Sequence, residues 1–218
     1  MFPFPFSFFG GVSGPPELEL IDNDFSMEFN GTDEYLGLPY STVLNSGASG
    51  YTVSSWVNVD NVSGYKTIYS TEYDEGVILL IFNASIYYYH YTGSGTISPP
   101  TTTSGGTLTA GQWHHVVMTW DGSNSIKLYL DKVLVNTQTG ATALDNPTAP
   151  SQYPKIGQYN TNWWMNGDLD EIAFWSRELD ATEVETIYDS TNDNPGKCAN
   201  LFTGGLGTDL VFWNRMGD

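Results

Sequence analysis

The sequence predicts an all-β domain, a sandwich of two antiparallel sheets with one short helix near its C-terminus. Short stretches in which apolar and polar residues alternate recur along the chain, which is typical of strands with one buried face. Turns that contain Gly, Asn or Asp separate these stretches. The 218 residues are 40% hydrophobic and only 15% charged, which suits one large β domain with a sizeable core.

Residues 1–16, MFPFPFSFFGGVSGPP, predict an extended arm. Pro3 and Pro5 oppose a helix, and no basic residue precedes Lys66, whereas a signal peptide begins with positive charge. The apolar run is also shorter than the about 20 residues of a membrane span. We expect the arm to be an assembly element packed on a neighbouring subunit; an arm folded back on its own domain and a disordered end are the alternatives. Its phenylalanines are Phe2, Phe4, Phe6, Phe8 and Phe9.

Predicted strands follow one another from residue 17 to residue 176. They are ELELI (17–21), SMEFN (26–30), EYLGL (34–38), YTVSSWVNV (51–59), KTIYSTE (66–72), GVILLIFN (76–83), ASIYYYHYT (84–92), QWHHVVMTW (112–120), SIKLYLDKVLVNTQT (125–139), YPKIGQY (153–159) and NGDLDEIAFWS (166–176). In the fourth stretch, Val53, Val57 and Val59 share one face and Trp56 lies on the other. Residues 93–111 are expected to form a long loop or a weak strand.

One segment, residues 180–190, has the spacing of an amphipathic helix. Asp180 is its expected N-cap, and Glu183, three residues later, completes a capping box. The expected apolar face consists of Leu179, Val184, Ile187 and Tyr188. We therefore place one sandwich domain over residues 17–190. Residues 191–218 are rich in turn-forming residues and predict an irregular C-terminal extension with one strand-like stretch, LVFW (210–213).

The charge balance restricts the partners. Seven Lys and Arg against 25 Asp and Glu give a net charge of −18, which repels nucleic acid and anionic membranes and attracts cations. Cys198 is the single cysteine, so no intrachain disulfide forms, and we interpret it as a small apolar residue. His114 and His115 are adjacent on a predicted strand and point to opposite faces, so they are expected to pack rather than to chelate one ion.

Four stretches, in this order and spacing, resemble the laminin-G-like, concanavalin A-like lectin/glucanase superfamily. They are SMEFNGTDEYLGL, YTVSSWVNV, GQWHHVVMTWDGSNSIKLYLDKVLV and KIGQYNTNWWMNGDLDEIAFWSRELDATEVETIY, and the resemblance covers residues 26–190. It implies a jelly-roll sandwich of two antiparallel sheets, one of them concave. The tail LVFWNRMGD (210–218) resembles the linker that follows such domains in structural proteins of marine phages.

The resemblance raises the question of glycosidase activity. The glucanases of the superfamily carry their carboxylates as Glu-x-Asp-x-x-Glu on one strand, and retaining enzymes need two carboxyl groups about 5 Å apart. Asp168 and Asp170 align with the first two positions, but Ala173 occupies the third. We therefore predict a protein that is not an enzyme.

The resemblance also implies a structural calcium ion at one edge of the sandwich. Asp33 and Asp170 are the implied side-chain ligands, with Asn30 or nearby carbonyl groups completing the shell. Calcium prefers six to eight oxygen ligands of these kinds. The alternative is a solvated acidic turn that holds no metal.

A candidate ligand-binding loop lies at residues 159–167, YNTNWWMNG. Its aromatic and amide side chains suit a sugar, and we predict as ligand-binding residues Tyr159, Asn160, Asn162, Trp163 and Trp164. Tyr87, Tyr89 and Tyr91 share one face of a predicted strand, with Tyr88 and His90 opposite, and are a second aromatic surface. A protein–protein contact is the alternative use of either surface.

The arm and the phage-like tail together favour a non-catalytic structural or adhesive protein of an assembled particle, a virion decoration or fibre component. Its partners would be its own or other particle subunits, and it would lie on the virion surface or outside the cell. The alternative is an extracellular carbohydrate-binding adhesin or module that binds surface glycans. A glycoside hydrolase is the third interpretation.

Overall fold

The structure is a computed structural model, and it describes residues 17–39, 50–71, 76–92, 95–99, 104–144 and 153–217. The predicted arm, with Phe2, Phe4, Phe6, Phe8 and Phe9, therefore lies outside the described residues, and its role in assembly stays a prediction.

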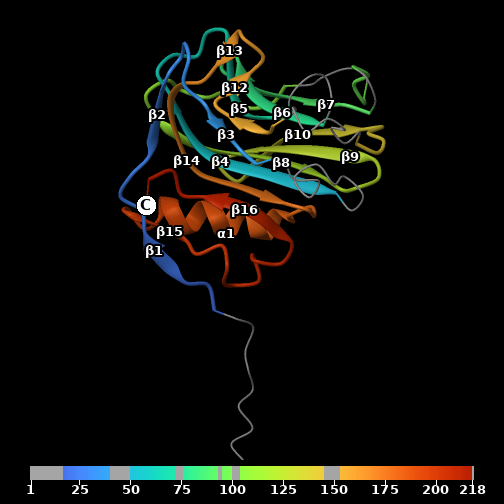
Figure 1. Ribbon diagram of the computed structural model, residues 1–218. Coiled ribbons are helices and arrows are strands. Elements are labelled where there is room, and N and C mark those ends of the chain that lie inside the picture. The colour runs from blue at the N-terminus through green and yellow to red at the C-terminus, as the bar shows by residue number, and fades with distance from the viewer. Residues whose placement is uncertain are drawn as a thin grey trace, which may run out of the picture.

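Two antiparallel sheets pack face to face and confirm the predicted sandwich (Figure 1). The seven-stranded sheet has the order β10-β9-β8-β4-β14-β16, with β2 also paired to β14, and the five-stranded sheet has the order β3-β11-β5-β6-β7. The strands of the first sheet are β2 (Met27–Asn30), β4 (Tyr51–Val59), β8 (Trp113–Trp120), β9 (Ser125–Leu130), β10 (Val133–Thr139), β14 (Asn166–Trp175) and β16 (Leu210–Asn214). Those of the second are β3 (Leu36–Gly37), β5 (Tyr65–Ser70), β6 (Val77–Phe82), β7 (Ser85–His90) and β11 (Lys155–Ile156).

The main core lies between the two sheets, where alternate residues of each strand point inward. Val53, Val57 and Val59 of β4 are buried there, as the alternation predicted, and Tyr88 of β7 meets them from the opposite sheet. Burial of such apolar side chains is worth about 1.5–3 kcal/mol each, so this layer supplies most of the stability of the fold. It also fixes which residues point outward.

A second apolar layer lies on the outer face of the seven-stranded sheet, where α1 (Ala181–Asn192) covers β8 and β14 (Figure 1). Val184 and Ile187 of the helix are buried against Val117 and Trp175 of the sheet. The predicted capping box is present, because the Asp180 side chain accepts a hydrogen bond from the backbone N–H of Glu183 at 2.9 Å and the reciprocal bond is also 2.9 Å. The capping box therefore fixes the start of the helix, and its apolar face packs on the sheet.

The C-terminal extension contains the predicted strand-like stretch and one further short strand. Within residues 191–218, β16 adds to the edge of β14, and β15 (Lys197–Ala199) pairs with β1 (Leu20–Asp22). Because β2 occupies the same edge of β14 only as far as Leu169, the rest of that edge is open to β16. The strand-like stretch LVFW does form a strand, and the chain end thereby becomes part of the sandwich.

His114 and His115 point to opposite faces of the seven-stranded sheet, as predicted. His114 Nδ1 lies 2.7 Å from Asp131 Oδ2, and His115 Nε2 lies 2.8 Å from the hydroxyl of Ser54. Each histidine is therefore held by a hydrogen bond within the fold.

Candidate functional site

The predicted ligand loop forms a small hairpin of β12 (Gln158–Tyr159) and β13 (Trp163–Trp164) over the outer face of the five-stranded sheet (Figure 1). The ring of Trp163 stacks on Tyr65 with centroids 4.1 Å apart, and the other face of Tyr65 stacks on Phe82 at 4.2 Å. Tyr159 is only 8% exposed and packs on Trp163. Two of the predicted ligand-binding aromatic residues therefore pack into the protein.

We call this group the aromatic cluster. Its members are Tyr65, Phe82, Tyr87, Tyr89, Tyr91, Tyr159 and Trp163. Several of these rings are stacked, so their flat faces are covered by neighbouring rings. This arrangement stabilises the hairpin but offers little ring surface to a ligand.

The other three residues of the predicted loop lie away from the aromatic cluster. The indole N–H of Trp164 donates to the carbonyl oxygen of Thr161 at 3.0 Å, and its ring tilts toward Tyr35. Asn160 and Asn162 are exposed in the turn. The five predicted residues thus do not converge on one pocket.

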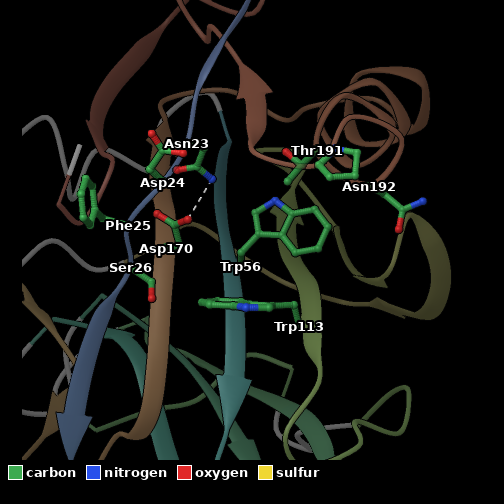
Figure 2. A pocket seen from close by; sticks show the side chains of 10 residues that line it. Asn23, Asp24, Phe25, Ser26, Trp56, Trp113, Asp170, Thr191 and Asn192 are labelled. Atoms are coloured by element: carbon green, nitrogen blue, oxygen red, sulfur yellow. Dashed lines mark hydrogen bonds between the residues drawn. The ribbon is translucent and has the colours of Figure 1, made fainter.

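A cleft of about 410 Å³ opens instead on the outer face of the seven-stranded sheet, beside the C-terminal end of α1 (Figure 2). It is lined by Asn23, Asp24, Phe25, Ser26, Trp56, Trp113, Asp170, Thr191, Asn192 and Pro195. Trp113 is 41% exposed and Phe25 is 63% exposed, so both aromatic rings are accessible at its rim. The cleft is therefore the better candidate for a ligand site.

Strand register places the outward-facing residues of the cleft and of the sheet surface beside it in rows. Trp113 lies opposite Asn58, Asn58 opposite Asp168, and Asp168 opposite Glu28. The next row places Trp56 opposite Asp170. Neighbouring strands are about 4.8 Å apart, so the first row runs about 14 Å across β8, β4, β14 and β2.

Trp56 is fixed in the floor of the cleft. Its ring stacks on His115, at 5.2 Å, and on Tyr188 of α1, at 5.5 Å, and it is 7% exposed. Its indole Nε1 is buried and has no hydrogen-bond partner, which leaves a donor available at a site that water reaches poorly. Figure 2 shows the five-membered ring of Trp56 on the side that faces Asn23 and Asp170.

The segment Asn23–Ser26, which we call the strap, forms one wall of the cleft between β1 and β2. The side-chain amide of Asn23 donates to Asp170 Oδ2 at 2.9 Å, and its backbone N–H donates to the carbonyl oxygen of Gly196 at 3.0 Å. The guanidinium of Arg215 donates to the carbonyl oxygen of Asp22. The C-terminal extension therefore positions the strap.

Asp170 is followed by a β-bulge that turns a second carboxyl group, Glu171, to the same side of the sheet. Glu171 has a φ of 50° and is 6% exposed, and its Oε2 accepts a hydrogen bond from the indole of Trp213 at 2.7 Å. Burial, followed by the nearby Asp170 charge, raises the pKa of Glu171 to about 7. Glu171 lies behind Trp56 with Cys198 and does not line the cleft.

Of the residues predicted to hold calcium, Asn30 and Asp33 lie in one turn, where the side-chain amide of Asn30 donates to Asp33 Oδ1 at 2.7 Å, but Asp170 lies apart from them. Asn30 Oδ1 accepts hydrogen bonds from Thr32 and Asp33 within its own turn. The register places Asn30 opposite Asn166, four residues and about 13 Å along β14 from Asp170. Asp170 contacts the strap instead. Calcium binding itself stays a prediction, with the turn as its remaining location.

Sequence reasoning missed the residues of the cleft because they look like core residues. Trp56 and Trp113 both lie in predicted strands, where a large apolar side chain usually belongs to the core. One signal was present: Trp56 is the single large apolar residue on a face of β4 that otherwise carries Thr52, Ser54 and Asn58. The strap carried no signal, because its position depends on the distant chain end.

Comparison with known protein families identifies the superfamily of this chain. A family model described as the concanavalin A-like lectin/glucanases superfamily matches residues 30–185. The chain belongs to this superfamily. The predicted resemblance is thereby confirmed, and the carboxylate strand β14 and both tryptophans of the cleft lie within the match.

Solved structures of the superfamily fold resemble the chain at low sequence identity. A protein from Bacteroides ovatus, described as carbohydrate-binding, has a TM-score of 0.65 and 15% identity, with 91% of this chain and 53% of that chain covered. The binding domain of Paraclostridial Mosquitocidal Protein 1 has a TM-score of 0.63 and 16% identity, with 79% and 45% covered. Domain 4 of an extracellular arabinanase from Geobacillus stearothermophilus, in complex with arabinotriose, has a TM-score of 0.58 and 18% identity, with 78% and 80% covered.

These likenesses establish the fold. The chain spans about half the length of the first two structures. No curated protein sequence matches the chain. None of the three structures named above is a phage protein, so the predicted likeness to phage structural proteins gains no support from them. In the described part of the chain, no helix has the length and apolar character to cross a bilayer.

Proposed function

We propose that this domain is a non-catalytic carbohydrate-binding module and that it binds an oligosaccharide in the cleft between the strap and Trp113. The observation that carries the proposal is the exposed ring of Trp113 beside buried polar atoms that have no partner. Solved structures of similar fold that are described as carbohydrate-binding, or that were solved with a bound oligosaccharide, support it.

The chemistry of the cleft suits a sugar. A pyranose or furanose ring has an apolar C–H face that packs on an aromatic ring, and hydroxyl groups around its edge that need donors and acceptors. Trp113 supplies the ring surface. The indole Nε1 of Trp56 supplies a donor, and the side-chain oxygen of Asn23, also buried and unpaired, supplies an acceptor. A hydroxyl group at this position would pair with both.

The walls of the cleft lie outside the part of the chain that the family model matches. Asn23–Ser26 precede residue 30 and Thr191–Pro195 follow residue 185, whereas Trp56, Trp113 and Asp170 lie inside the match. We infer that the common fold supplies the aromatic floor and that the flanking segments shape it for a particular ligand.

The arrangement of carboxyl groups supports a binding role. Asp170 lines the cleft, but Glu171, the carboxyl group with a raised pKa, is enclosed behind Trp56. Ala173, at the third position of the glucanase pattern, is fully buried beneath the helical layer. A hydrolase needs an acid and a second carboxylate on either side of the bond to be cleaved, and this pair does not flank the cleft.

We infer an extracellular location, since the related arabinanase is described as extracellular. The earlier prediction of a virion component gains no support from the family match or the structural likenesses. The carbohydrate-binding module, which was the alternative from sequence, fits them better.

The test is binding of a panel of purified oligosaccharides, including arabino-, cello- and chito-oligosaccharides, measured by isothermal titration calorimetry. At least one should bind, and Trp113→Ala should weaken it about tenfold or more, equivalent to about 1.4 kcal/mol. Tyr35→Ala is the matched control, because Tyr35 is a 46% exposed aromatic residue that does not line the cleft. Unchanged affinity in Trp113→Ala, or no binding to any member of the panel, would overturn the proposal.

A further inference from the structure

The cleft and the sheet surface beside it carry negative charge without basic side chains. Asp24 and Asp170 line the cleft, and Asp168 and Glu28 face outward in the adjoining row. Among the described residues that line the cleft, none is Lys, Arg or His. This negative charge disfavours binding of an acidic sugar, because a carboxylated or sulfated ligand would be repelled.

Two basic side chains that contact Asp22, next to the strap, are already paired. Lys197 forms an ion pair with Asp22, on the side of the strap that faces β15. The guanidinium of Arg215 lies 3.5 Å from Glu171. Neither basic residue lines the cleft. The described residues that line the cleft therefore add no positive charge beside the carboxylates of Asp168 and Glu28.

The carboxylates are crowded enough to disfavour one another. Asp168 sits directly opposite Glu28 on the neighbouring strand, and like charges in facing positions are destabilising. Burial, together with the charges of Glu28 and Asp60, raises the pKa of Asp168. A neutral ligand would leave this repulsion in place, whereas a cationic ligand would relieve it.

The spacing favours separate cationic groups over one metal ion. Asp168 and Asp170 are two residues apart on β14, or about 6.6 Å along the strand. Within the described ranges, no three His, Cys, Asp or Glu side chains are close enough together to hold a metal ion. Charges spread along the rows match a ligand that carries its positive charges at intervals.

The aromatic floor favours a ring-shaped ligand over a basic peptide. Trp56 is 7% exposed, and its unpaired Nε1 lies in the floor of the cleft, where a hydroxyl group can accept its hydrogen bond. Trp113 presents ring surface at the rim. Together these groups call for hydroxyl groups and an apolar ring face, which a lysine side chain lacks.

We propose that the cleft selects saccharides with free amino groups, of the glucosamine oligomer type, over neutral and acidic saccharides. This inference rests on the proposed carbohydrate-binding function and adds the charge of the ligand to it. The aromatic floor holds the sugar ring, and the carboxylates of Asp168, Glu28 and Asp170 pair with the ammonium groups.

The experiment compares three oligomers of equal length by calorimetry at pH 6: glucosamine, N-acetylglucosamine and glucose, all β-1,4-linked. The glucosamine oligomer should bind about tenfold or more tightly than the other two, and 1 M NaCl should remove most of the difference. The double variant Asp168→Asn/Glu28→Gln should reduce the preference to less than about threefold without weakening any binding of the glucose oligomer. Asp209→Asn, which removes an exposed acidic group outside the cleft, is the matched control and should retain the full preference.

The outcomes separate this inference from the function on which it rests. Equal affinity for the glucosamine and glucose oligomers, or a preference that survives in the double variant, would overturn the inference and leave carbohydrate binding intact. Binding of none of the three oligomers, together with no binding in the wider panel, would overturn both. A lysine pentapeptide that binds as tightly as the glucosamine oligomer would also overturn the inference, because the surface would then recognise charge alone.

Discussion

The aromatic cluster and the cleft use the same kinds of residue on the outer faces of opposite sheets, with different results. In the aromatic cluster, the ring of Tyr65 is covered on both faces by Phe82 and Trp163, at 4.2 and 4.1 Å. In the cleft, Trp113 keeps 41% of its surface exposed, while Trp56 on the neighbouring strand is 7% exposed and stacks on Tyr188. Aromatic content therefore does not identify a binding surface; what matters is whether a second element covers the rings.

The covering element differs between the two faces. The β12–β13 hairpin lies across the five-stranded sheet and contributes Trp163 to the stack. Over the seven-stranded sheet, α1 ends at Asn192, so it covers His115 and part of Trp56 but not Trp113. The place where the helix stops is the place where the cleft begins.

The largest expected effect is on stability, in the aromatic cluster. Trp163→Ala should lower the free energy of unfolding by about 3–4 kcal/mol, because it removes a large ring from a packed stack. Trp113→Ala should lower it by less than about 1 kcal/mol, because that ring is partly in water already. Urea unfolding of the two variants measures both values. Equal losses of unfolding free energy in the two variants would contradict this difference between the surfaces. Ligand binding that fails in a folded Trp163→Ala variant but survives in Trp113→Ala would reverse their roles.

The second effect concerns the carboxyl group behind the cleft. Glu171 has a pKa of about 7, against 4.5 for the free group, so the folded protein holds this proton more tightly than the unfolded chain does. The contribution of the Glu171 proton to the free energy of unfolding is therefore fully present below about pH 4.5. It is lost as the pH rises to about 7, and the total loss is about 3 kcal/mol. Glu171→Gln should remove this loss, so the variant should gain on the wild type across that window.

Two buried histidines change the stability with pH in the opposite direction. The quantity to measure is therefore the difference in unfolding free energy between the wild type and Glu171→Gln. Burial lowers the pKa of His90 to about 4 and that of His115 to about 3, so both add stability as the pH rises toward 6.5. Subtracting the unfolding free energy of Glu171→Gln from that of the wild type cancels their contribution. A difference that stays constant from pH 4.5 to 8 would show that Glu171 does not titrate in this range.

The fold could be predicted well from the sequence because its signals are local. Alternation in β4 correctly separated the inward valines from Trp56, and the capping box at Asp180 correctly placed the helix start. The stretch LVFW was predicted as strand-like, but its partner strand could not be predicted. Its pairing with β14 depends on the part of the β14 edge that β2 leaves unpaired, which is a property of the whole sheet.

The candidate site could not be predicted for a related reason. The predicted loop does contain aromatic residues, but whether Trp163 faces solvent depends on Tyr65, which lies 98 positions earlier in the chain. The cleft needs the strap, β4, β8, β14 and the end of α1 at once. No local sequence pattern predicts that these elements meet. The strap is held by hydrogen bonds to Arg215 and Gly196, which lie near the chain end.

The third effect isolates the unpaired donor of Trp56. Trp56→Phe keeps an aromatic ring in contact with His115 and Tyr188 but removes Nε1. A buried donor without a partner costs about 1–3 kcal/mol, which offsets the smaller ring, so stability should change by less than about 1 kcal/mol. Sugar affinity should fall about tenfold, because the hydrogen bond to the ligand is lost. Thermal unfolding and calorimetry on the same preparation measure the two quantities, and unchanged affinity would exclude Nε1 from the site.

The smallest effect concerns calcium. With Asp170 engaged by Asn23 and separated from the turn, the oxygens that remain near Asn30 are those of Asp33 and Glu34, on exposed side chains. A site with two carboxylates is short of the six to eight oxygens that calcium prefers, so we expect binding that is weak and adds only about 0.4 kcal/mol when calcium equals its Kd.

Melting temperatures with 5 mM calcium and with chelator therefore should differ by no more than about 2 °C in a chain of this size. Asp33→Ala should remove what difference there is, whereas Asp170→Ala should leave it unchanged, because Asp170 lies about 13 Å away along β14. A large increase in melting temperature that both variants abolish would restore the original ligand set. It would mean that the metal draws together two parts of the sheet that hydrogen bonding keeps apart here, and that the strap moves away from Asp170 when calcium binds.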